Sequence, residues 1–544
     1  MRAYLQTAVA SALRALGIEP PARVPFERPR QVGHGDLTTT VAMVLAKSLR
    51  RNPRELALQI TEHLAVDPAR IAKVEVAGAG FINFTFAHGY TREQLRALIR
   101  AGENYGRSDL GRGTRVQVEF VSANPTGPLT VGHGRGAVFG DTVARLLEWT
   151  GHSVEREYYF NNAGRQMRIL GDSVRRRYLE LLGDRVEFPE DYYQGEYIKD
   201  IARHLVDKAG DSLRTDPPEG EFKTRAEAEI FQDIGKTLER LGIRFDHYFN
   251  EHTLYTDGKI EEVIAVLRAR DLVYQQDGAL WFRTSALGLE KDKVIVKSTG
   301  EPTYRLPDIA YHREKFSRGF DLMIDVFGAD HIATYPDVVA GVQALGLDAS
   351  KVKVLIHQFV TIVQGGEVVK MSTRKANFIT LDELIEEVGA DAVRYFFNMR
   401  TITSHMNFDL DLAKKQSDEN PVYYLQYAHA RISSILRYAE QLGVRDLAAE
   451  ADLNLLTTPE ELGLTKAVLS FPGVLESCAL SHEPHRLAEY LHGLAGTFHS
   501  FYAAHRVVSD DPRLSGARLA LVKGVQIVIR NGLSVLGVSA PEKM

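Results

Sequence analysis

The sequence predicts an α/β protein in three parts: a parallel-sheet domain with a helical insertion, a smaller α+β domain before it and an all-helical domain after it. Three observations predict this fold class. A strand, a glycine-rich loop, a helix and a second strand follow one another over residues 114–160, as in a βαβ unit. Residues 161–275 are highly charged and are predicted to be mostly helical. After Asp382 no further strand is expected.

Residues 1–110 are expected to form the small α+β domain. Two alternating runs of apolar residues, separated by Gly78 and Gly80, predict paired strands over 71–86. Helices are predicted from apolar residues at helical spacing over 5–16, 37–49 and 52–60.

Residues 111–380 are expected to hold the parallel sheet, with a helical insertion over about 161–275. Residues 364–367, with two glycines, predict the turn of a hairpin. The helix after the first strand is expected over 136–149. Strands are predicted from runs of β-branched and aromatic residues over 114–121, 154–160, 278–283, 293–297, 321–327 and 352–363.

Residues 381–544 are expected to form the all-helical domain. Their apolar residues recur at the spacing of one helix face. The helices are predicted over 381–399, 421–442, 463–480, 484–505 and 513–536.

Composition excludes several classes of protein. The chain has 544 residues, 44% hydrophobic and 25% charged, which is typical of a soluble globular protein of several domains. The one cysteine, Cys478, excludes an intramolecular disulfide and a multi-cysteine zinc site. The N-terminal apolar segment is interrupted by Arg14, and no long uncharged apolar run follows. We therefore expect no signal peptide, no membrane span and a cytoplasmic location.

Charge is distributed unevenly along the chain. The net charge is −5, but residues 1–110 hold 15 Lys and Arg against 10 Asp and Glu, so this segment is +5 and the remainder −10. A basic N-terminal domain on an acidic chain indicates a polyanionic partner. Chance remains an equal alternative for an excess of this size.

Two segments have the residue types of a phosphate site. Residues 128–134, PLTVGHG, lie between a strand and a helix, where glycines and free N–H groups suit a phosphate and His133 can donate a hydrogen bond. Residues 370–374, KMSTR, follow the hairpin and combine two cations with two hydroxyls, which suits a phosphate clamp. Taken singly, the first could be a glycine-rich turn with a packed histidine, and the second a solvated basic loop.

Together, in this order on a split βαβ sheet, the two segments are similar to the HIGH and KMSKS signatures of class I aminoacyl-tRNA synthetases. Further segments extend the resemblance over essentially the whole chain and specify the bacterial arginyl-tRNA synthetase family. They are VEFVSANPTGPLTVGHGR, EREYYFNNAGRQM, YRLPDIAYHREKF, KMSTRKANFITLDEL, GADAVRYFF, NPVYYLQYAHARI and LGVSAPEKM, with GDLTTTVAMVLAK and AGAGFINFTF in the N-terminal domain.

The resemblance implies a Rossmann-like catalytic domain, a tRNA-contacting N-terminal domain and an anticodon-binding C-terminal domain. It implies an arginine–tRNA ligase that uses ATP, with Mg²⁺, to activate L-arginine and charge tRNA(Arg). A monomer with no membrane partner and no metal ligands of its own is expected. Two alternatives are a synthetase-like protein that binds tRNA without aminoacylation, and another class I nucleotidyl transferase.

The resemblance also implies site residues for ATP. His133 and Lys370 are expected to be catalytic because they would stabilise charge on the reacting phosphate. One residue departs from the signature: Thr130 stands where the HIGH motif has its first histidine, which keeps a hydrogen-bond donor but loses the imidazole. The expected ATP-binding residues are Thr130, Gly132, His133, Gly328, Asp330, Lys370, Met371 and Ser372.

For arginine, a selective pocket needs carboxylates placed for bidentate contact with a guanidinium. The resemblance implies that Tyr304 and Asp308 line the guanidinium side, with Glu119 as the second carboxylate. It implies that Ser122 and Asn124 hold the amino and carboxylate end. Asp308 could instead be a charge at a helix start after Pro307. The arginine-binding residues expected are Glu119, Ser122, Asn124, Tyr304 and Asp308.

Two further expectations concern RNA and adenine. Phe81, Asn83 and Phe84 in the N-terminal domain could stack on and hydrogen-bond to an RNA loop, or the phenylalanines could be core residues with only Asn83 exposed. The resemblance favours a tRNA contact, and Asn83 is the residue predicted to make it. His357 is expected beside the adenine. In the C-terminal domain, Tyr423, Tyr424, Tyr427 and His429 have helical spacing, and most are expected in the core with one or two exposed.

Overall fold

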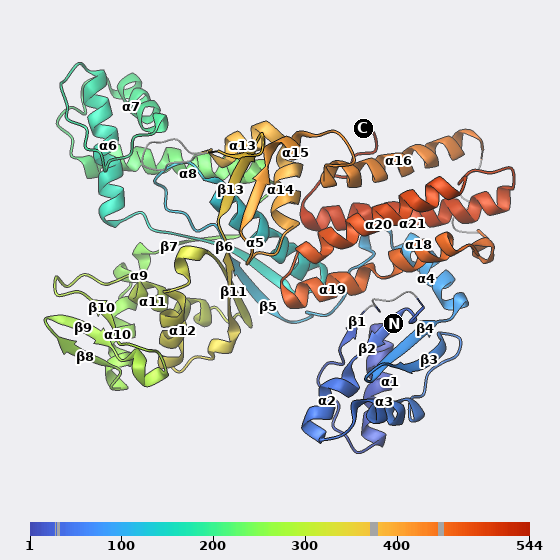
Figure 1. The fold of residues 1–544 in the computed structure, drawn as a ribbon. Helices are drawn as coiled ribbons and strands as arrows, with labels where there is room; N and C mark the ends of the chain where they lie inside the picture. The colour runs from blue at the N-terminus through green and yellow to red at the C-terminus, as the bar shows by residue number, and fades with distance from the viewer. Residues whose placement is uncertain (28, 30–32, 370–378, 444–450) are drawn as a thin grey trace.

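The computed structural model describes residues 1–544 except 28, 30–32, 370–378 and 444–450. A parallel sheet lies at the centre of the molecule, and the C-terminal helices extend from one side of it (Figure 1). The N-terminal unit, in blue, lies below these helices, so the two ends of the chain share one side of the molecule.

The central sheet has five parallel strands in the order β12-β11-β5-β6-β7, so β5 is in the middle. The chain passes from β5 to β6 and β7 on one side, and later places β11 and β12 on the other. This arrangement confirms the predicted parallel sheet. The strands are β5 (Arg115–Glu119), β6 (Ser153–Phe160), β7 (His247–Asn250), β11 (Leu322–Gly328) and β12 (Val352–His357).

Strand β7 lies inside the segment that was predicted to be mainly helical. It pairs with β6, from Glu157↔His247 to Phe160↔Asn250. The insertion between β6 and β7 is helical and projects away from the sheet, at the upper left of Figure 1. Its helices are α6 (Gly164–Leu181), α7 (Glu196–Ala209) and α8 (Lys223–Arg240).

Two predicted strands are not part of the parallel sheet. Strands β9 and β10 form a separate antiparallel sheet with β8, because short connections allow only antiparallel pairing here. This sheet and the helices around it form the lower left lobe of Figure 1. The lobe contains α9 (His252–Thr256), α10 (Lys259–Ala269), β8 (Val273–Gln276), β9 (Ala279–Phe282), β10 (Lys293–Val296), α11 (Arg305–Ser317) and α12 (Tyr335–Ala344).

Helix α5 (Val131–Trp149) follows β5 and begins five residues earlier than predicted, because Thr130 caps it. Two glycines in α5 are required by close packing. A Cβ on Gly134 would lie 2.5 Å from Leu381, and one on Gly140 would lie 2.4 Å from the ring of Phe120. Gly134, which the sequence placed in a loop, therefore lets the helix approach Leu381, and Gly140 lets it lie against Phe120 at the end of β5.

The expectation of no strand after Asp382 is wrong, since β15 (Met406–Asp409) pairs in parallel with β13 (Val360–Gln364). The predicted hairpin is confirmed, because β13 pairs with β14 (Glu367–Val368) across two glycines with positive φ. The helix predicted over 381–399 is broken at Gly389, where φ is +82°. Its parts are α13 (Leu381–Val388) and α14 (Ala390–Asn398), and α15 (Leu410–Lys414) follows β15.

The N-terminal unit is α+β as predicted, with an antiparallel sheet in the order β1-β2-β4-β3. The helix predicted from residue 37 begins at Val41, because the β-branched residues Thr38 and Thr39 belong to a strand that pairs with β4. The elements are α1 (Arg2–Ala15), β1 (Phe26–Glu27), β2 (Leu37–Thr39), α2 (Val41–Leu49), α3 (Pro53–Glu62), β3 (Ile71–Ala77), β4 (Phe81–Phe86) and α4 (His88–Ala101).

The C-terminal helices pack around α21, which is long and apolar enough to span a membrane by length and composition alone. In the structure, 83% of the most apolar 18-residue stretch of α21 is buried, so α21 is a core helix. Lys466 and Asp36 form a 2.7 Å ion pair between this domain and the N-terminal unit. The helices are α16 (Pro421–Gln441), α18 (Pro459–Leu469), α19 (Phe471–Ser481), α20 (His485–Ala504) and α21 (Pro512–Leu536).

Candidate active site

The strands that follow β5 lie on one side of it (β6 and β7) and then on the other (β11 and β12), so the strand order reverses at β5. The carboxyl end of the strands at such a point is the usual ligand site of an open parallel sheet. Two residues just after this strand, Val121 and Ser122, have φ of +68° and +44°. Left-handed backbone is costly for a β-branched residue, so the loop at this edge is strained, as is common at functional sites. The strand end itself carries Glu119.

At the start of α5, Thr130 and His133 form a reciprocal cap. The Thr130 hydroxyl accepts a hydrogen bond from the His133 backbone N–H at 3.4 Å, and Nδ1 of His133 accepts one from the Thr130 N–H at 3.1 Å. Burial lowers the pKa of His133, so the ring is neutral near pH 7. Because Nδ1 is an acceptor, the proton is on Nε2, which can donate to a phosphate oxygen.

The surroundings of His133 include three residues from the other strand ends. His357 pairs in register with Gly328. It also lies close to α5, because a Cβ added to Gly136 would lie 3.0 Å from Nε2 of His357. Burial lowers the pKa of His357 to about 4, and among the described residues its buried Nδ1 has no hydrogen-bond partner. The side chain of Asp330 is 75% exposed. Its negative charge acts to raise the pKa of both His133 and His357, against the larger effect of burial. These residues meet at one edge of the sheet.

The predicted residues Lys370, Met371 and Ser372 lie outside the described residues. The described chain reaches Val369, directly after β14. The backbone N–H of Val369 donates to the carbonyl of Ile362 in β13.

An acidic pocket lies beside the end of β5. Burial raises the pKa of Asp308 to about 7, and the carboxylates of Glu251 and Glu119 add to the rise. Within the described residues, no hydrogen bond or ion pair engages the Asp308 carboxylate. A cation that enters the pocket stabilises the ionised form of such a buried carboxyl group.

Two residues of this pocket were missed by the sequence analysis. Glu251 follows β7 and accepts a hydrogen bond from the Tyr159 hydroxyl at 2.7 Å. Burial raises the pKa of Tyr159 well above 10, and Asp308, Glu251 and Glu119 all contribute. The tyrosine therefore lies among all three carboxylates. A run of aromatic residues at 247–250 could have revealed β7, and with it the position of Glu251 at a strand end.

Ser122 and Asn124 tie the loop after β5 to the end of β6. The Ser122 hydroxyl donates to Glu119 at 2.9 Å and accepts from the Tyr159 N–H at 3.2 Å, so it holds Glu119 in place. Asn124 accepts from the Asn161 N–H at 3.0 Å. The side-chain N–H of Asn124 donates to Gln166 at 3.1 Å.

Tyr304 stands at the start of α11, one turn before Asp308. Its side chain is 72% exposed, so in this structure it lies open to solvent at the rim rather than inside the pocket. The Asp308 N–H donates to the Tyr304 carbonyl at 3.2 Å.

The expected exposure of Asn83 is wrong. In β4 Asn83 pairs in register with Thr38 of β2 and with Glu75 of β3, and only 6% of the residue is exposed. Phe81, at the start of the same strand, is 37% exposed. Phe84 is fully buried, so it is a core residue and not a base contact. The tRNA contact of Asn83 stays a prediction.

The C-terminal domain presents a cluster of aromatic and basic side chains on α16 and α20. The rings of Tyr423 and Tyr427 stack with centroids 6.2 Å apart, and the Arg431 guanidinium lies about 5 Å from the rings of Tyr427 and Tyr502. The expectation that most of the four predicted residues lie in the core with one or two exposed is wrong: His429 is buried, whereas Tyr423, Tyr424 and Tyr427 are half-buried.

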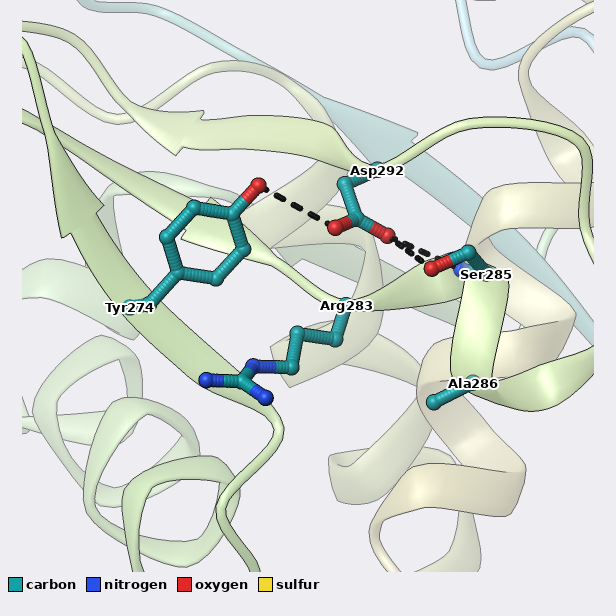
Figure 2. Close-up of a pocket in the computed structure, with 5 residues that line it drawn as sticks. All are labelled: Tyr274, Arg283, Ser285, Ala286 and Asp292. Atoms are coloured by element: carbon teal, nitrogen blue, oxygen red, sulfur yellow. Dashed lines mark hydrogen bonds between the residues drawn. The ribbon is translucent and has the colours of Figure 1, made fainter.

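A shallow hollow of about 480 Å³ lies on the small antiparallel lobe, away from the predicted site residues (Figure 2). Its one carboxylate is already engaged, since Asp292 accepts hydrogen bonds from Tyr274 and Ser285. Arg283 lies over the Tyr274 ring. The hollow thus offers no free carboxylate for a cationic substrate.

Three family models match the chain. The model described as "tRNA synthetases class I (R), catalytic domain" covers residues 94–408, more than half of the chain. The "Arginyl tRNA synthetase N terminal domain" covers residues 3–86, and the "DALR anticodon binding domain" covers residues 425–544.

Curated relatives match over almost the full length. The chain is 56% identical over 521 residues to a protein of Desulfotalea psychrophila named arginine–tRNA ligase, covering 95% of this chain and 94% of the relative. A Chlorobaculum parvum protein of the same name is 52% identical over all of both chains. Among solved structures, the fold is similar to that of Thermus thermophilus arginyl-tRNA synthetase, with a TM-score of 0.79, 24% identity and full coverage of both chains.

Proposed function

This chain belongs to the arginyl-tRNA synthetase family, and from that premise we propose which of its residues perform the reaction. The activity is that of an arginine–tRNA ligase, in which ATP activates L-arginine and the arginyl group passes to tRNA(Arg). The predicted recognition, fold class and enzyme class are confirmed by the family models and relatives.

The observation that carries the site assignment is the unpaired Asp308 carboxylate in the acidic pocket. A guanidinium is always cationic and donates from a planar fork, so it can contact Asp308 and a second carboxylate together. Glu251 and Glu119 are the second carboxylates that the pocket offers. Tyr304 at the rim would close over the bound side chain, and Asn124 would receive the amino and carboxylate end.

Activation is in-line attack of the arginine carboxylate on the α-phosphorus of ATP, with pyrophosphate as the leaving group. The neutral His133 donates from Nε2 to a phosphate oxygen and stabilises the negative charge of the transition state. Lys370, Met371 and Ser372 are proposed to bind the phosphates, from their place in the second signature. Gly132 leaves room for the nucleotide, and Asp330 beside Gly328 accepts from the ribose hydroxyls.

Transfer follows on the same site. A terminal adenosine hydroxyl of the tRNA attacks the carbonyl carbon of arginyl-adenylate, and AMP leaves. No side chain is a covalent nucleophile in either step, so positioning and charge stabilisation supply the catalysis. Mg²⁺ enters bound to the phosphates of ATP, because hard oxygen ligands suit it.

For tRNA binding we propose two stacking surfaces. Phe81 at the start of β4, with Asn83 beside it, would receive an unpaired base of the tRNA, since exposed aromatic rings stack on bases. Tyr423, Tyr427 and Arg431 on α16 would contact the anticodon. The proposed functional units remain residues 1–110, 111–380 and 381–544, in a cytoplasmic monomer with no membrane partner.

ATP–pyrophosphate exchange with each amino acid, with and without tRNA(Arg), tests this function. Exchange is expected with arginine alone among the amino acids and only when cognate tRNA is present. Exchange with a different amino acid would contradict the arginine pocket. Tight tRNA binding without any exchange or charging would instead support a binding protein without catalysis.

A further inference from the structure

Three buried carboxylates lie in register across neighbouring strands of the central sheet. Glu119 of β5 pairs with Glu157 of β6 on one side and with Asp325 of β11 on the other. All three residues are at most 2% exposed. Buried carboxyl groups this close together raise the pKa of one another. The three can stay ionised only if cations lie beside them.

Helix α11 supplies those cations across the row. The Lys315 ammonium is fully buried and lies 2.6 Å from both Glu119 Oε2 and Asp325 Oδ1. Arg318, one turn later, donates to Glu157 at 2.8 Å. The same helix carries Asp308, so one element brings a pocket carboxylate and the buried cations to the sheet.

The three carboxylates do not share their partners equally. Glu157 accepts from Arg318 and the Tyr311 hydroxyl, and Asp325 accepts from Lys315 and from His312 Nε2 at 2.9 Å. Glu119 accepts only from Lys315 and the Ser122 hydroxyl among the described residues. Lys315 is thus the one cation in contact with Glu119 in the described part of the chain.

We propose that Lys315 is a positioning residue for arginine recognition, whose ammonium holds the Glu119 carboxylate in a fixed orientation beside Asp308. The proposal rests on the proposed function, in which Glu119 belongs to the arginine pocket. Lys315 engages Oε2 and Ser122 engages Oε1, which fixes the plane of the carboxylate. Each oxygen keeps a further lone pair for a donor from the substrate.

The variant Lys315→Met tests the proposal directly. Without the ammonium, Glu119 retains a hydroxyl partner only and takes up a proton, so it no longer attracts the arginine cation. The arginine KM is expected to rise about tenfold or more over wild type at pH 7, and this ratio should shrink towards pH 9 as Glu119 ionises. The ATP KM should change little.

Several groups titrate or carry charge around Glu119, so wild type must be measured over the same pH range. They are Lys315, Asp308 and Tyr311 of α11, Asp325 of β11, and Glu157 and Tyr159 of β6. The ratio of variant to wild type at each pH cancels the titrations that both proteins share.

Asp325→Asn is the matched control. It disturbs the same buried cluster but leaves Lys315 on Glu119 and removes a carboxylate that raises the pKa of Glu119. Its melting temperature is expected to fall, while the arginine KM stays near that of wild type at every pH. Equal, pH-independent increases in the arginine KM of both variants would mean that the cluster is merely structural, and would overturn the proposal.

A double variant keeps the test decisive if Lys315→Met does not fold alone. Glu119→Gln combined with Lys315→Met removes both members of the pair. If Lys315 acts through Glu119, the double variant should have the arginine KM of Glu119→Gln, and a further increase would overturn the proposal. An unchanged arginine KM in Glu119→Gln itself would instead show that the proposed role of Glu119 is wrong.

Discussion

The backbone N–H of Thr130 donates to Nδ1 of His133 across 3.1 Å, and the Thr130 hydroxyl lies 3.3 Å from the same nitrogen. The cap of α5 and the orientation of the phosphate-site imidazole are therefore one structure. The position where this chain departs from the HIGH signature still supports the histidine that remains.

We expect Thr130→Val to lower stability more than catalysis. The valine removes the hydroxyl that caps α5 but keeps the backbone N–H that orients His133. Loss of such a cap costs about 1 kcal/mol, which is measurable as a lower melting temperature. Thr130→Ser should restore it. A tenfold fall in kcat for adenylate formation with an unchanged melting temperature would show that the hydroxyl acts on the phosphates instead.

His133→Ala should damage catalysis far more than any change at Thr130. Removal of one preorganised donor to a transition-state oxygen lowers kcat by roughly 10²–10³-fold. Single-turnover adenylate formation measures this step. His133→Gln, which keeps a side-chain donor, is the companion variant and should recover part of the rate. A His133→Ala enzyme as active as wild type would contradict the phosphate assignment.

The pKa of about 7 for Asp308 predicts a pH dependence of arginine binding. An unfolded aspartate ionises near pH 4, so between about pH 4 and pH 7 the folded free protein holds a proton that the unfolded chain has lost. The contribution of Asp308 to stability therefore falls as pH rises through this window. Arginine binding needs the ionised form, so affinity should increase from pH 6 to pH 8.

Proton release on binding checks that pH dependence. Calorimetric titration of arginine at pH 7, in two buffers of different ionisation enthalpy, should detect a fraction of a proton released. Asp308→Asn protein, titrated with the same ligand at higher concentration, should release less. Identical proton release from both proteins would assign the titrating group elsewhere.

Phe81→Ala should weaken tRNA binding and leave amino-acid chemistry intact. Stacking of one base on an aromatic ring is worth about 1–3 kcal/mol, so the Kd for tRNA(Arg) should rise by roughly tenfold. Leu58→Ala on α3, another exposed apolar residue of the same domain, is the control. Equal effects of the two changes on the Kd would argue against a specific base contact at Phe81.

The fold followed from local patterns where those patterns were strong. Alternating residues in β5 and the spacing in α21 were sufficient to predict both elements. Strand β7 was missed because it has only four residues, and β2 was missed because Thr38 and Thr39 precede a run with helical spacing. Pairing between distant segments, as for β13 with β15, is a tertiary property that no local pattern contains.

The site was only partly predictable for a similar reason. The resemblance pointed to Asp308 and His133 through their motifs, and the structure places them in an acidic pocket and at the cap of α5. Glu251 and Lys315 are far from Glu119 along the chain. Lys315 contacts Glu119, and Glu251 contacts Tyr159 of the same pocket, only after the sheet has assembled. The burial of Asn83 likewise depends on its strand lying in the middle of the small sheet.

The central claim is that the Asp308 carboxylate recognises the arginine cation, and the arginine kcat/KM of Asp308→Asn tests it most directly. A buried charge pair that loses one partner typically costs about 3–5 kcal/mol, so kcat/KM for arginine should fall by roughly a hundredfold or more. The ATP KM should be unchanged. Free-protein stability at pH 8 should hold or rise, because an unpaired buried carboxylate is removed. Arginine kinetics equal to those of wild type would contradict the account.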